Sequence, residues 1–425
     1  MSYLGNWWIV RATALLPVIA AVAIVELRSG DFRSSGAMSV FAISPMIILV
    51  SIVVARPWKS KSMLRRLFGV AGVVILSAVT LFAALGGIPS FLRAEFGLFI
   101  SIDDYGPRSI IATGHGYVAV GDDVNGNAVV WLSEAGDRWS RIPHEKALER
   151  LEVGDVLTTS NRLVMVAHDE STGSVVALTS KDGLGWTRAG IAPVHGMPVA
   201  LAANGINLAV VGESFSSDSA FWSADSPESW SVSRPEPHTD TGKDAVDLLG
   251  LNGAYTAAIN QKSNALIFES EDGTNWTEIT RFGDSDFGSL AIIGRTALAV
   301  GFDRDTKSGA IWASEDGGEW KRLSPPNEFD GTRLDLAVSN GEELVIFGNR
   351  LDDDTIVSWR TYDGAAWEGI PVDFGDFIVR DAAFGQDGIV LVGVDRALNS
   401  AAIFTSTDGR NWDRIPHDEL LFAVR

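Results

Sequence analysis

The stretch Ser270-Glu271-Asp272-Gly273-Thr274-Asn275-Trp276 decides the fold of this chain, because it is one of seven copies of a single turn. Each copy ends on a tryptophan, and neighbouring copies are 44 to 47 residues apart. Seven copies at such a period indicate a repeat fold. The seven tryptophans are Trp139, Trp186, Trp230, Trp276, Trp320, Trp367 and Trp412.

Each repeat is expected to contain four short strands. In the fifth, residues 289–293 and 297–301 predict a hairpin, 310–314 a third strand and 320–323 a fourth. Several repeats carry Asn-Gly or Asp-Gly between the first two strands, and these pairs favour tight hairpins. Four antiparallel strands in about 45 residues are typical of a β-propeller blade. Residues 107–425 therefore predict a seven-bladed β-propeller.

Charge is distributed unevenly along the 425 residues, whose formal net charge is -20. Residues 1–106 carry nine basic and five acidic side chains, so the excess negative charge lies in 107–425. Such an acidic part would repel phosphates, which argues against a nucleic-acid partner. The absence of cysteine excludes disulfides, thiolate metal sites and cysteine nucleophiles. The six histidines show no metal-ligand spacing, so we expect no metal and no cofactor.

Residues 1–88 predict a membrane anchor of three helices, and the fold class is thus an all-β propeller behind an N-terminal α-helical transmembrane region. The stretches 37–55 and 67–88 are uncharged, and 7–25 is interrupted only by Arg11. Each is close to the roughly 20 residues needed to cross a bilayer. Five basic residues in 56–66 place that loop in the cytoplasm and the propeller outside it. A cleaved signal peptide in residues 1–25 is the alternative for the first stretch.

Residues 89–106 join the predicted anchor to the predicted propeller. They are rich in apolar side chains and have few charged ones. Two interpretations stay open, an interfacial segment lying along the membrane surface and an ordinary linker packed under the propeller.

The Ser-x-Asp-Gly-x-x-Trp turns resemble the Asp-box, or bacterial neuraminidase repeat, of the sialidase-like superfamily. The resemblance covers the whole acidic part and implies a propeller, but the boxes also occur in propellers without enzyme activity. It implies that the turn aspartates serve the fold and lie on the face opposite a sialidase active site. These aspartates are Asp182, Asp272, Asp316, Asp363 and Asp408.

The loops between second and third strands are rich in carboxylates, on the face away from the turns. Carboxylates there predict a site for a cation, an amine-bearing ligand or a basic partner. The alternative is a solvated acidic surface that keeps an exported protein soluble. The candidates are Asp122, Asp123, Asp303, Asp305, Asp352, Asp353 and Asp354.

The sequence thus predicts a non-enzymatic binding module at the cell membrane, presenting its propeller outside the cytoplasm to a protein partner or cell-surface glycan. One alternative is a sialidase-like glycoside hydrolase, although no catalytic residue can be assigned. The Arg-Ile-Pro signature of sialidases does occur at 141–143 and 414–416, but in fourth strands, where the match is accidental. The other alternative is an assembly factor for a membrane protein complex.

Overall fold

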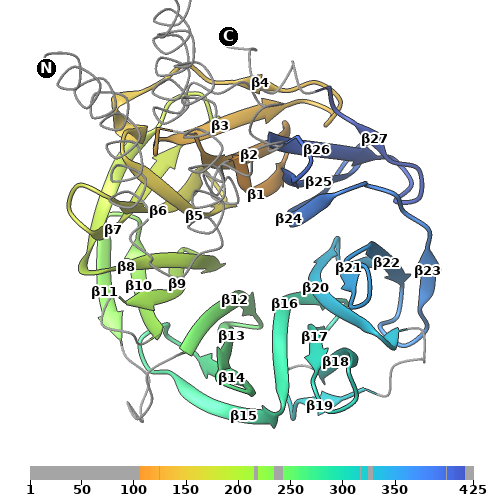
Figure 1. Cartoon of the computed structure of the whole chain (residues 1–425). Coiled ribbons are helices and arrows are strands. Elements are labelled where there is room, and N and C mark those ends of the chain that lie inside the picture. Colours follow the sequence, from red (N-terminus) through yellow and green to blue (C-terminus); the bar gives the residue numbers. More distant parts are fainter. Residues whose placement is uncertain are drawn as a thin grey trace, which may run out of the picture. The chain divides into compact units, whose positions relative to one another are not determined.

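The computed structural model describes residues 106–123, 125–214, 219–233, 243–315, 317–323, 329–398 and 400–416. All of them lie in the second of the chain's two units, Asp103–Arg425. Their strands form six antiparallel sheets, five with four strands and one with seven. The seven-stranded sheet comprises two blades that share strand β8 (Thr187–Asn204). The described residues therefore form seven four-stranded blades arranged in a ring, a β-propeller (Figure 1).

The blades follow one another in chain order, and their strands run outward from the axis in sequence order. The first strands, nearest the axis, are β1 (Gly106–Thr113), β5 (Leu151–Thr158), the second half of β8, β12 (Lys243–Leu251), β16 (Ser285–Ile293), β20 (Thr332–Ser339) and β24 (Phe377–Gly385). The second strands are β2 (Gly116–Asp122), β6 (Leu163–Asp169), β9 (Asn207–Ser214), β13 (Ala254–Gln261), β17 (Thr296–Asp303), β21 (Leu344–Arg350) and β25 (Gly388–Asp395).

The outer half of each blade is shorter. The third strands are β3 (Ala128–Ser133), β7 (Ser174–Ser180), β10 (Ser219–Ser226), β14 (Asn264–Ser270), β18 (Ser308–Glu315), β22 (Ile356–Thr361) and β26 (Ser400–Ser406). The fourth strands are β4 (Ser140–Arg141), the first half of β8, β11 (Ser229–Ser233), β15 (Thr277–Gly283), β19 (Lys321–Arg322), β23 (Glu368–Ile370) and β27 (Asp413–Arg414). The predicted strands of the fifth repeat correspond to β16 to β19.

Turn chemistry explains where the hairpins close. Asn252 and Gly253 between β12 and β13 both have positive φ, 52° and 87°, as a tight hairpin of this hand requires. A second local feature is a register shift at the same point of every first strand. In five blades a glycine of the second strand lies against this bulge, and at Gly393 a Cβ atom would overlap the carbonyl oxygen of Ile378.

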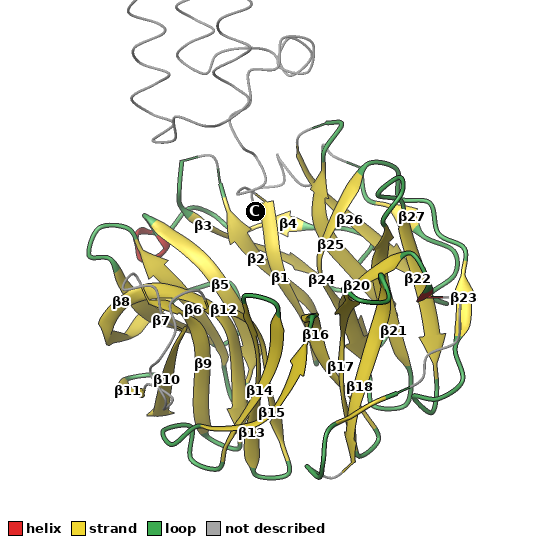
Figure 2. Ribbon diagram, turned by 60° about the horizontal axis from the view of Figure 1, so that its bottom comes forward, coloured by secondary structure: helices red, strands yellow, loops and turns green. Residues whose placement is uncertain are grey.

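The hydrophobic core lies between the blades. Seven clusters of buried side chains fill the seven junctions between neighbouring sheets, including the junction between the last blade and the first. Between blades 3 and 4, for example, Phe221 stacks on Trp276 with ring centroids 4.3 Å apart. Figure 2 shows these sheets packed face to face around the axis. Because each blade has apolar side chains on both faces, only a closed ring covers all of them.

The predicted fold class needs a correction in its helical part. The described residues are all-β apart from short 3₁₀ segments, of which η2 (Lys146–Leu148) has three residues. No helix in this described part is long and apolar enough to cross a bilayer. The stretches 7–25, 37–55 and 67–88, on which the three transmembrane helices were predicted, lie outside the described residues. Apolar length is a necessary condition for a membrane span, but it does not by itself establish a helix.

Candidate functional site

Two faces of the ring differ in the loops that form them. The box face is formed by the turns between third and fourth strands and by the hairpins between first and second strands. The loop face is formed by the loops between second and third strands and by the links between blades. The two faces are opposite because consecutive strands of a blade are antiparallel.

The turn aspartates of the box face are used by their own turns. Oδ1 of Asp272 accepts hydrogen bonds from the backbone N–H groups of Thr274 and Asn275, both at 2.8 Å. Asp363 and Asp408 each accept hydrogen bonds from the two corresponding backbone N–H groups of their own turns, all at 2.8 Å. Asp182 accepts one such bond, from the backbone N–H of Leu184. These bonds favour the ionised form, so the pKa of Asp272, Asp363 and Asp408 lies below its ordinary value. Asp316 lies outside the described residues.

The other turn residues also bond within the turn. In the fourth blade Ser270 Oγ accepts the N–H of Gly273 at 2.8 Å, and Trp276 Nε1 donates to the carbonyl of Gly273 at 2.9 Å. The first copy keeps both bonds, at Ser133 and Trp139, although Ala135 replaces the aspartate. The polar side chains of these turns therefore bond within the turn and stabilise the blade.

Three of the seven loop-face carboxylates predicted to meet a ligand are buried or half-buried and paired with arginines. Asp122 is buried, lies 2.5 Å from Arg108 Nε and accepts the N–H of Val153, and burial raises its pKa to about 7. Asp303 is buried against Arg322. Asp123 pairs with Arg141 at 3.1 Å and caps the loop that follows it.

A pair of this kind recurs in four blades, and sequence reasoning missed it. Each pair joins an aspartate at the end of the second strand to an arginine two residues after the box tryptophan. The pairs are Asp123–Arg141, Asp169–Arg188, Asp303–Arg322 and Asp395–Arg414. The sequence signal for these pairs is Trp-x-Arg. It includes Arg141 and Arg414, the arginines of the two Arg-Ile-Pro matches, and each of them pairs with an aspartate of its own blade.

The four other predicted carboxylates, Asp305, Asp352, Asp353 and Asp354, are exposed, and their loops are joined. Lys307 O accepts the N–H of Gly331, whose carbonyl accepts the N–H of Leu351. Arg396 Nη1 then bridges to Asp354 Oδ2 at 2.5 Å. Leu351 and Leu398, 50% and 53% exposed, belong to the same loops. We call residues 304–307, 351–355 and 396–398 the acidic sector of the loop face. It carries four aspartates and three basic side chains, of which Arg304 pairs with Asp286 outside the sector and Arg396 with Asp354.

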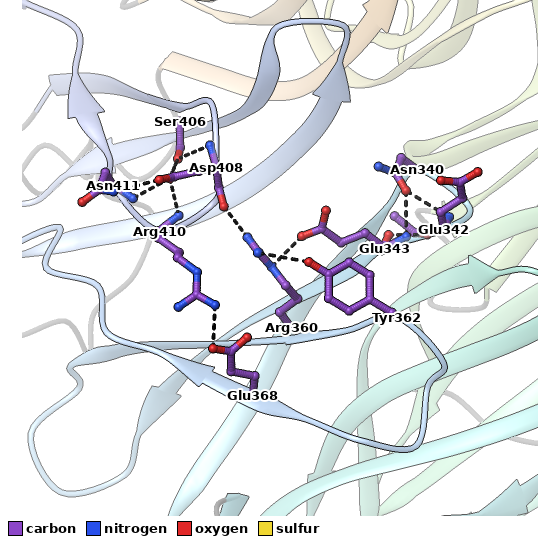
Figure 3. A network of polar contacts seen from close by, with 11 residues as sticks. Asn340, Glu342, Glu343, Arg360, Tyr362, Glu368, Ser406, Asp408, Arg410 and Asn411 are labelled. Carbon is purple, nitrogen blue, oxygen red and sulfur yellow. Dashed lines mark hydrogen bonds and ion pairs between the residues drawn. The ribbon is translucent and has the colours of Figure 1, made fainter.

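The junction of blades 6 and 7 on the box face contains a buried arginine. Arg360, whose side chain is 8% exposed, places Nε 2.5 Å from Glu343 Oε1. Its Nη1 donates to Tyr362 Oη at 3.3 Å and its Nη2 to the carbonyl oxygen of Asp408 in the next blade (Figure 3). The six other blades have Leu132, Thr179, Trp222, Glu269, Ala313 and Thr405 at this position, none of them an arginine. The guanidinium is thus held by protein groups on all sides and serves as an inter-blade lock.

Three further carboxylates, Asp155, Asp247 and Asp381, follow the bulge of their first strands, and we call them the axis carboxylates. Oδ1 of each accepts the N–H of the next residue, at 2.7 Å. Oδ2 accepts an N–H of the neighbouring blade, at 2.7 to 2.8 Å, from Leu201, Leu290 and Ile110 respectively. The sequence signal is an aspartate at the same first-strand position in three repeats. It is recognised only when the repeats are aligned by the position of the bulge, which the structure provides.

Burial raises the pKa of all three axis carboxylates, to about 6 for Asp247 and about 7 for Asp381. Asp247 and Asp381 also feel the charge of Asp155, although the three lie in blades 2, 4 and 7. All three lie on first strands, the strands nearest the ring axis. Within the described residues no group of three His, Asp or Glu side chains has a metal-binding arrangement.

Comparison with solved structures finds propellers. YCF48 bound to D1 peptide matches with a TM-score of 0.51 at 16% identity, over 69% of this chain and 91% of that one. The β-propeller domain of the Trilobed protease from Pyrococcus furiosus matches with a TM-score of 0.49 at 12% identity, over 73% and 98%. Virginiamycin B lyase from Staphylococcus aureus matches with a TM-score of 0.47 at 12% identity, over 73% and 94%.

No protein-family model and no curated protein matches the chain. The Asp-box resemblance therefore stays a prediction. The strand topology and the YCF48 match both show that this chain has the fold of a β-propeller.

Proposed function

We propose that this propeller is a binding module for a protein partner, and that the acidic sector of the loop face takes a segment of the partner containing Lys or Arg beside apolar residues. The observation that carries the proposal is the combination of exposed carboxylates with Leu351 and Leu398 on three joined loops. The carboxylates attract a basic segment, and the leucines offer apolar area that a partner can cover.

The energetics favour a contact made by several groups together. An exposed ion pair contributes roughly 0.2 to 1 kcal/mol. Covering the exposed half of a leucine adds about 1 kcal/mol. Three ion pairs and two leucines together supply a few kcal/mol, part of it screened by salt. Weak, salt-dependent recognition is therefore expected.

The comparison supports a peptide-binding role by analogy only. The solved structure of YCF48 contains a bound D1 peptide, and that propeller shares the fold of this chain. An assembly role for a membrane protein complex is a narrower form of the same proposal, in which the bound segment belongs to a membrane protein.

The test measures binding of full-length protein in mild detergent to fluorescent peptides of alternating Lys and Leu. We expect the triple variant Asp305→Asn, Asp352→Asn, Asp353→Asn to lose about tenfold in affinity, if each charge contributes about 0.5 kcal/mol. The matched control removes three exposed charges from the box face, with Glu271→Gln, Glu315→Gln and Glu342→Gln. Equal losses in both variants would mean that net charge, and not the acidic sector, attracts the peptide.

Attachment to the cell membrane through residues 1–88, with the propeller outside the cytoplasm, is part of the proposal. It is supported by the apolar stretches of that region and by the basic loop at 56–66. A reporter fused after Ile88 is expected to be cut by external protease in intact cells. Protection of the reporter would reverse the proposed side.

Glycan binding and glycoside hydrolysis are the other candidates from the sequence. Sialidases use arginine, tyrosine and glutamate side chains, and Arg360, Tyr362 and Glu343 do lie together. However, Arg360 is engaged with Glu343, Tyr362 and Asp408, so this cluster does not present a guanidinium to a substrate carboxylate. Turnover of a chromogenic sialoside or other glycoside by the full chain would favour the hydrolase instead.

A further inference from the structure

The sequence contains four Asn-Gly pairs, and their side-chain chemistry plays no part in the proposed binding. The pairs are Asn125-Gly126, Asn204-Gly205, Asn252-Gly253 and Asn340-Gly341, all within the described residues. In such a pair the backbone nitrogen of the glycine can attack the side-chain carbonyl carbon of the asparagine, because glycine has no side chain to obstruct the approach. The attack closes a five-membered succinimide ring and releases ammonia. Water then opens the ring at one of its two carbonyls, which gives aspartate or isoaspartate.

The reaction needs conformational freedom as well as the right residues. The asparagine must rotate about its Cα–C bond so that its side chain meets the next nitrogen, and the N–H of the glycine must leave any acceptor that it has. A hydrogen bond to that N–H, or a strand pair that fixes the asparagine, therefore slows the reaction. The four pairs differ in these restraints.

The pair in blade 6 is held by three hydrogen bonds. The N–H of Gly341 donates to Ser339 Oγ at 2.9 Å. Asn340 Oδ1 accepts the backbone N–H groups of Glu342 and Glu343, at 3.0 and 2.8 Å (Figure 3). Both the attacking nitrogen and the side chain under attack are thus engaged, and the reaction requires that these bonds break first.

The pairs in blades 1 and 3 are restrained through the backbone. The N–H of Gly126 donates to the carbonyl oxygen of Asp123 at 2.9 Å. Asn204 is the last residue of β8, is half-buried and pairs with Asn207 across the hairpin. Rotation about the Cα–C bond of Asn204 therefore disrupts the last pair of that hairpin.

Asn252 and Gly253 in blade 4 lack restraints of this kind. The two residues form the whole turn between β12 and β13, and the strand pair that closes the turn is Leu251 with Ala254. Both turn residues are exposed and have positive φ. Within the described part of the chain, neither the Asn252 side chain nor the Gly253 N–H makes a hydrogen bond. Both residues can therefore rotate while the strand pairs on either side stay formed.

We propose that Asn252 is a site of spontaneous deamidation, through a succinimide formed with Gly253 and opened by water. The product has one more carboxylate at the tip of the β12–β13 hairpin, on the box face. In the isoaspartate product the backbone also gains one methylene group, which distorts a two-residue turn because the length of the loop selects the turn type. The chain thus becomes more acidic with age and its β12–β13 hairpin loosens, while the acidic sector of the loop face is unchanged.

The test follows the folded full-length chain in mild detergent during storage at mildly alkaline pH. Samples are digested at acidic pH, where the reaction is slow, and mass spectrometry measures the deamidated fraction at each Asn-Gly pair. Methylation by an isoaspartate methyltransferase identifies the isoaspartate product. Asn252 is expected to react roughly tenfold faster than Asn340, because the hydrogen bonds of the Asn340 turn must break first. The same chain unfolded in urea is the matched control, in which the four pairs are expected to react at similar rates.

Two variants test the explanation. Asn252→Gly removes the side-chain amide and keeps a residue that tolerates positive φ, so the folded chain should lose most of its acidic shift. Ser339→Ala removes the acceptor of the Gly341 N–H, and deamidation at Asn340 should rise several-fold; an unchanged rate there overturns the assignment of the order to hydrogen bonding. Equal rates at Asn252 and Asn340 in the folded native chain overturn the proposal, as does a faster rate at either of the other two pairs. This comparison needs no variant, so it decides the proposal even if a variant does not fold.

Discussion

Replacing Arg360 by methionine tests the inter-blade lock at the junction of blades 6 and 7. Methionine keeps most of the side-chain volume but removes three contacts, to Glu343, Tyr362 and the carbonyl oxygen of Asp408. Glu343 is 19% exposed, so its carboxylate remains largely buried without a cation. The carbonyl of Asp408 also loses its donor from the neighbouring blade.

The expected loss of stability follows from this geometry. Removing one partner of a buried ion pair costs about 3 to 5 kcal/mol, because an uncompensated charge remains. Partial exposure of Glu343 relieves part of that cost, so we expect about 2 to 3 kcal/mol for Arg360→Met. Adding Glu343→Gln removes the stranded charge and should restore at least 1 kcal/mol of the loss.

Urea unfolding of the full-length chain, followed by tryptophan fluorescence, measures the effect as a shift in midpoint at constant slope. The matched control is Arg281→Met, which removes an exposed ion pair with Glu278 and should cost at most about 1 kcal/mol. Equal shifts for Arg360→Met and Arg281→Met would refute the assignment of Arg360 as a buried lock. A double variant less stable than Arg360→Met would refute the stranded-charge explanation.

Three other outcomes are expected. Gly393→Ala should cost about 3 kcal/mol of unfolding free energy in the same assay, because the added Cβ would overlap the carbonyl oxygen of Ile378. Gly205→Ala has open space around the added Cβ and should lose stability only through its positive φ. Equal losses in the two variants would contradict the steric argument. Trp276→Phe should cost about 1 to 2 kcal/mol through the lost bond to Gly273 and the reduced ring area, and a loss below 0.5 kcal/mol would contradict it. The pKa of Asp122, Asp247 and Asp381 is raised by folding, so the folded chain binds more protons and the thermal midpoint should fall from pH 6 to pH 8. As pH is lowered below about 4 the midpoint should fall as well, because the pKa of Asp272 and Asp408 is lowered by folding; a midpoint that rises from pH 6 to pH 8 contradicts the first sign, and one that does not fall on acidification below pH 4 contradicts the second.

The features that could be predicted from the sequence are the turns and hairpins, because short-range contacts form them. A box turn is closed by residues within seven positions of one another, as at Ser270, Gly273 and Trp276. The hairpin at Asn252-Gly253 is likewise set by its own two residues. Seven such units at constant spacing predict seven blades before any distant contact is known. One boundary that this reasoning missed lies in β8, where a fourth strand continues into the next first strand without a turn; another is the start of β16, which is Ser285 and not residue 289.

The roles of the carboxylates were decided by contacts between distant residues. Asp303 and Asp305 stand two positions apart where β17 ends, yet the first is buried against Arg322 and the second is exposed. Similarly, Ile110 and Asp381 are 271 positions apart in the sequence, and their hydrogen bond forms because the ring brings the last blade next to the first.

The sequence by itself therefore determined the repeat, the turns and the all-β character of the described part of the propeller, since all of these depend on short-range backbone preferences. Only the tertiary structure decided which acids are buried, paired or exposed, because that depends on which blade lies next to which. The same holds for the junction between the last blade and the first, where Ile110 and Tyr117 of the first blade donate hydrogen bonds to Asp381 and Gly388 of the last.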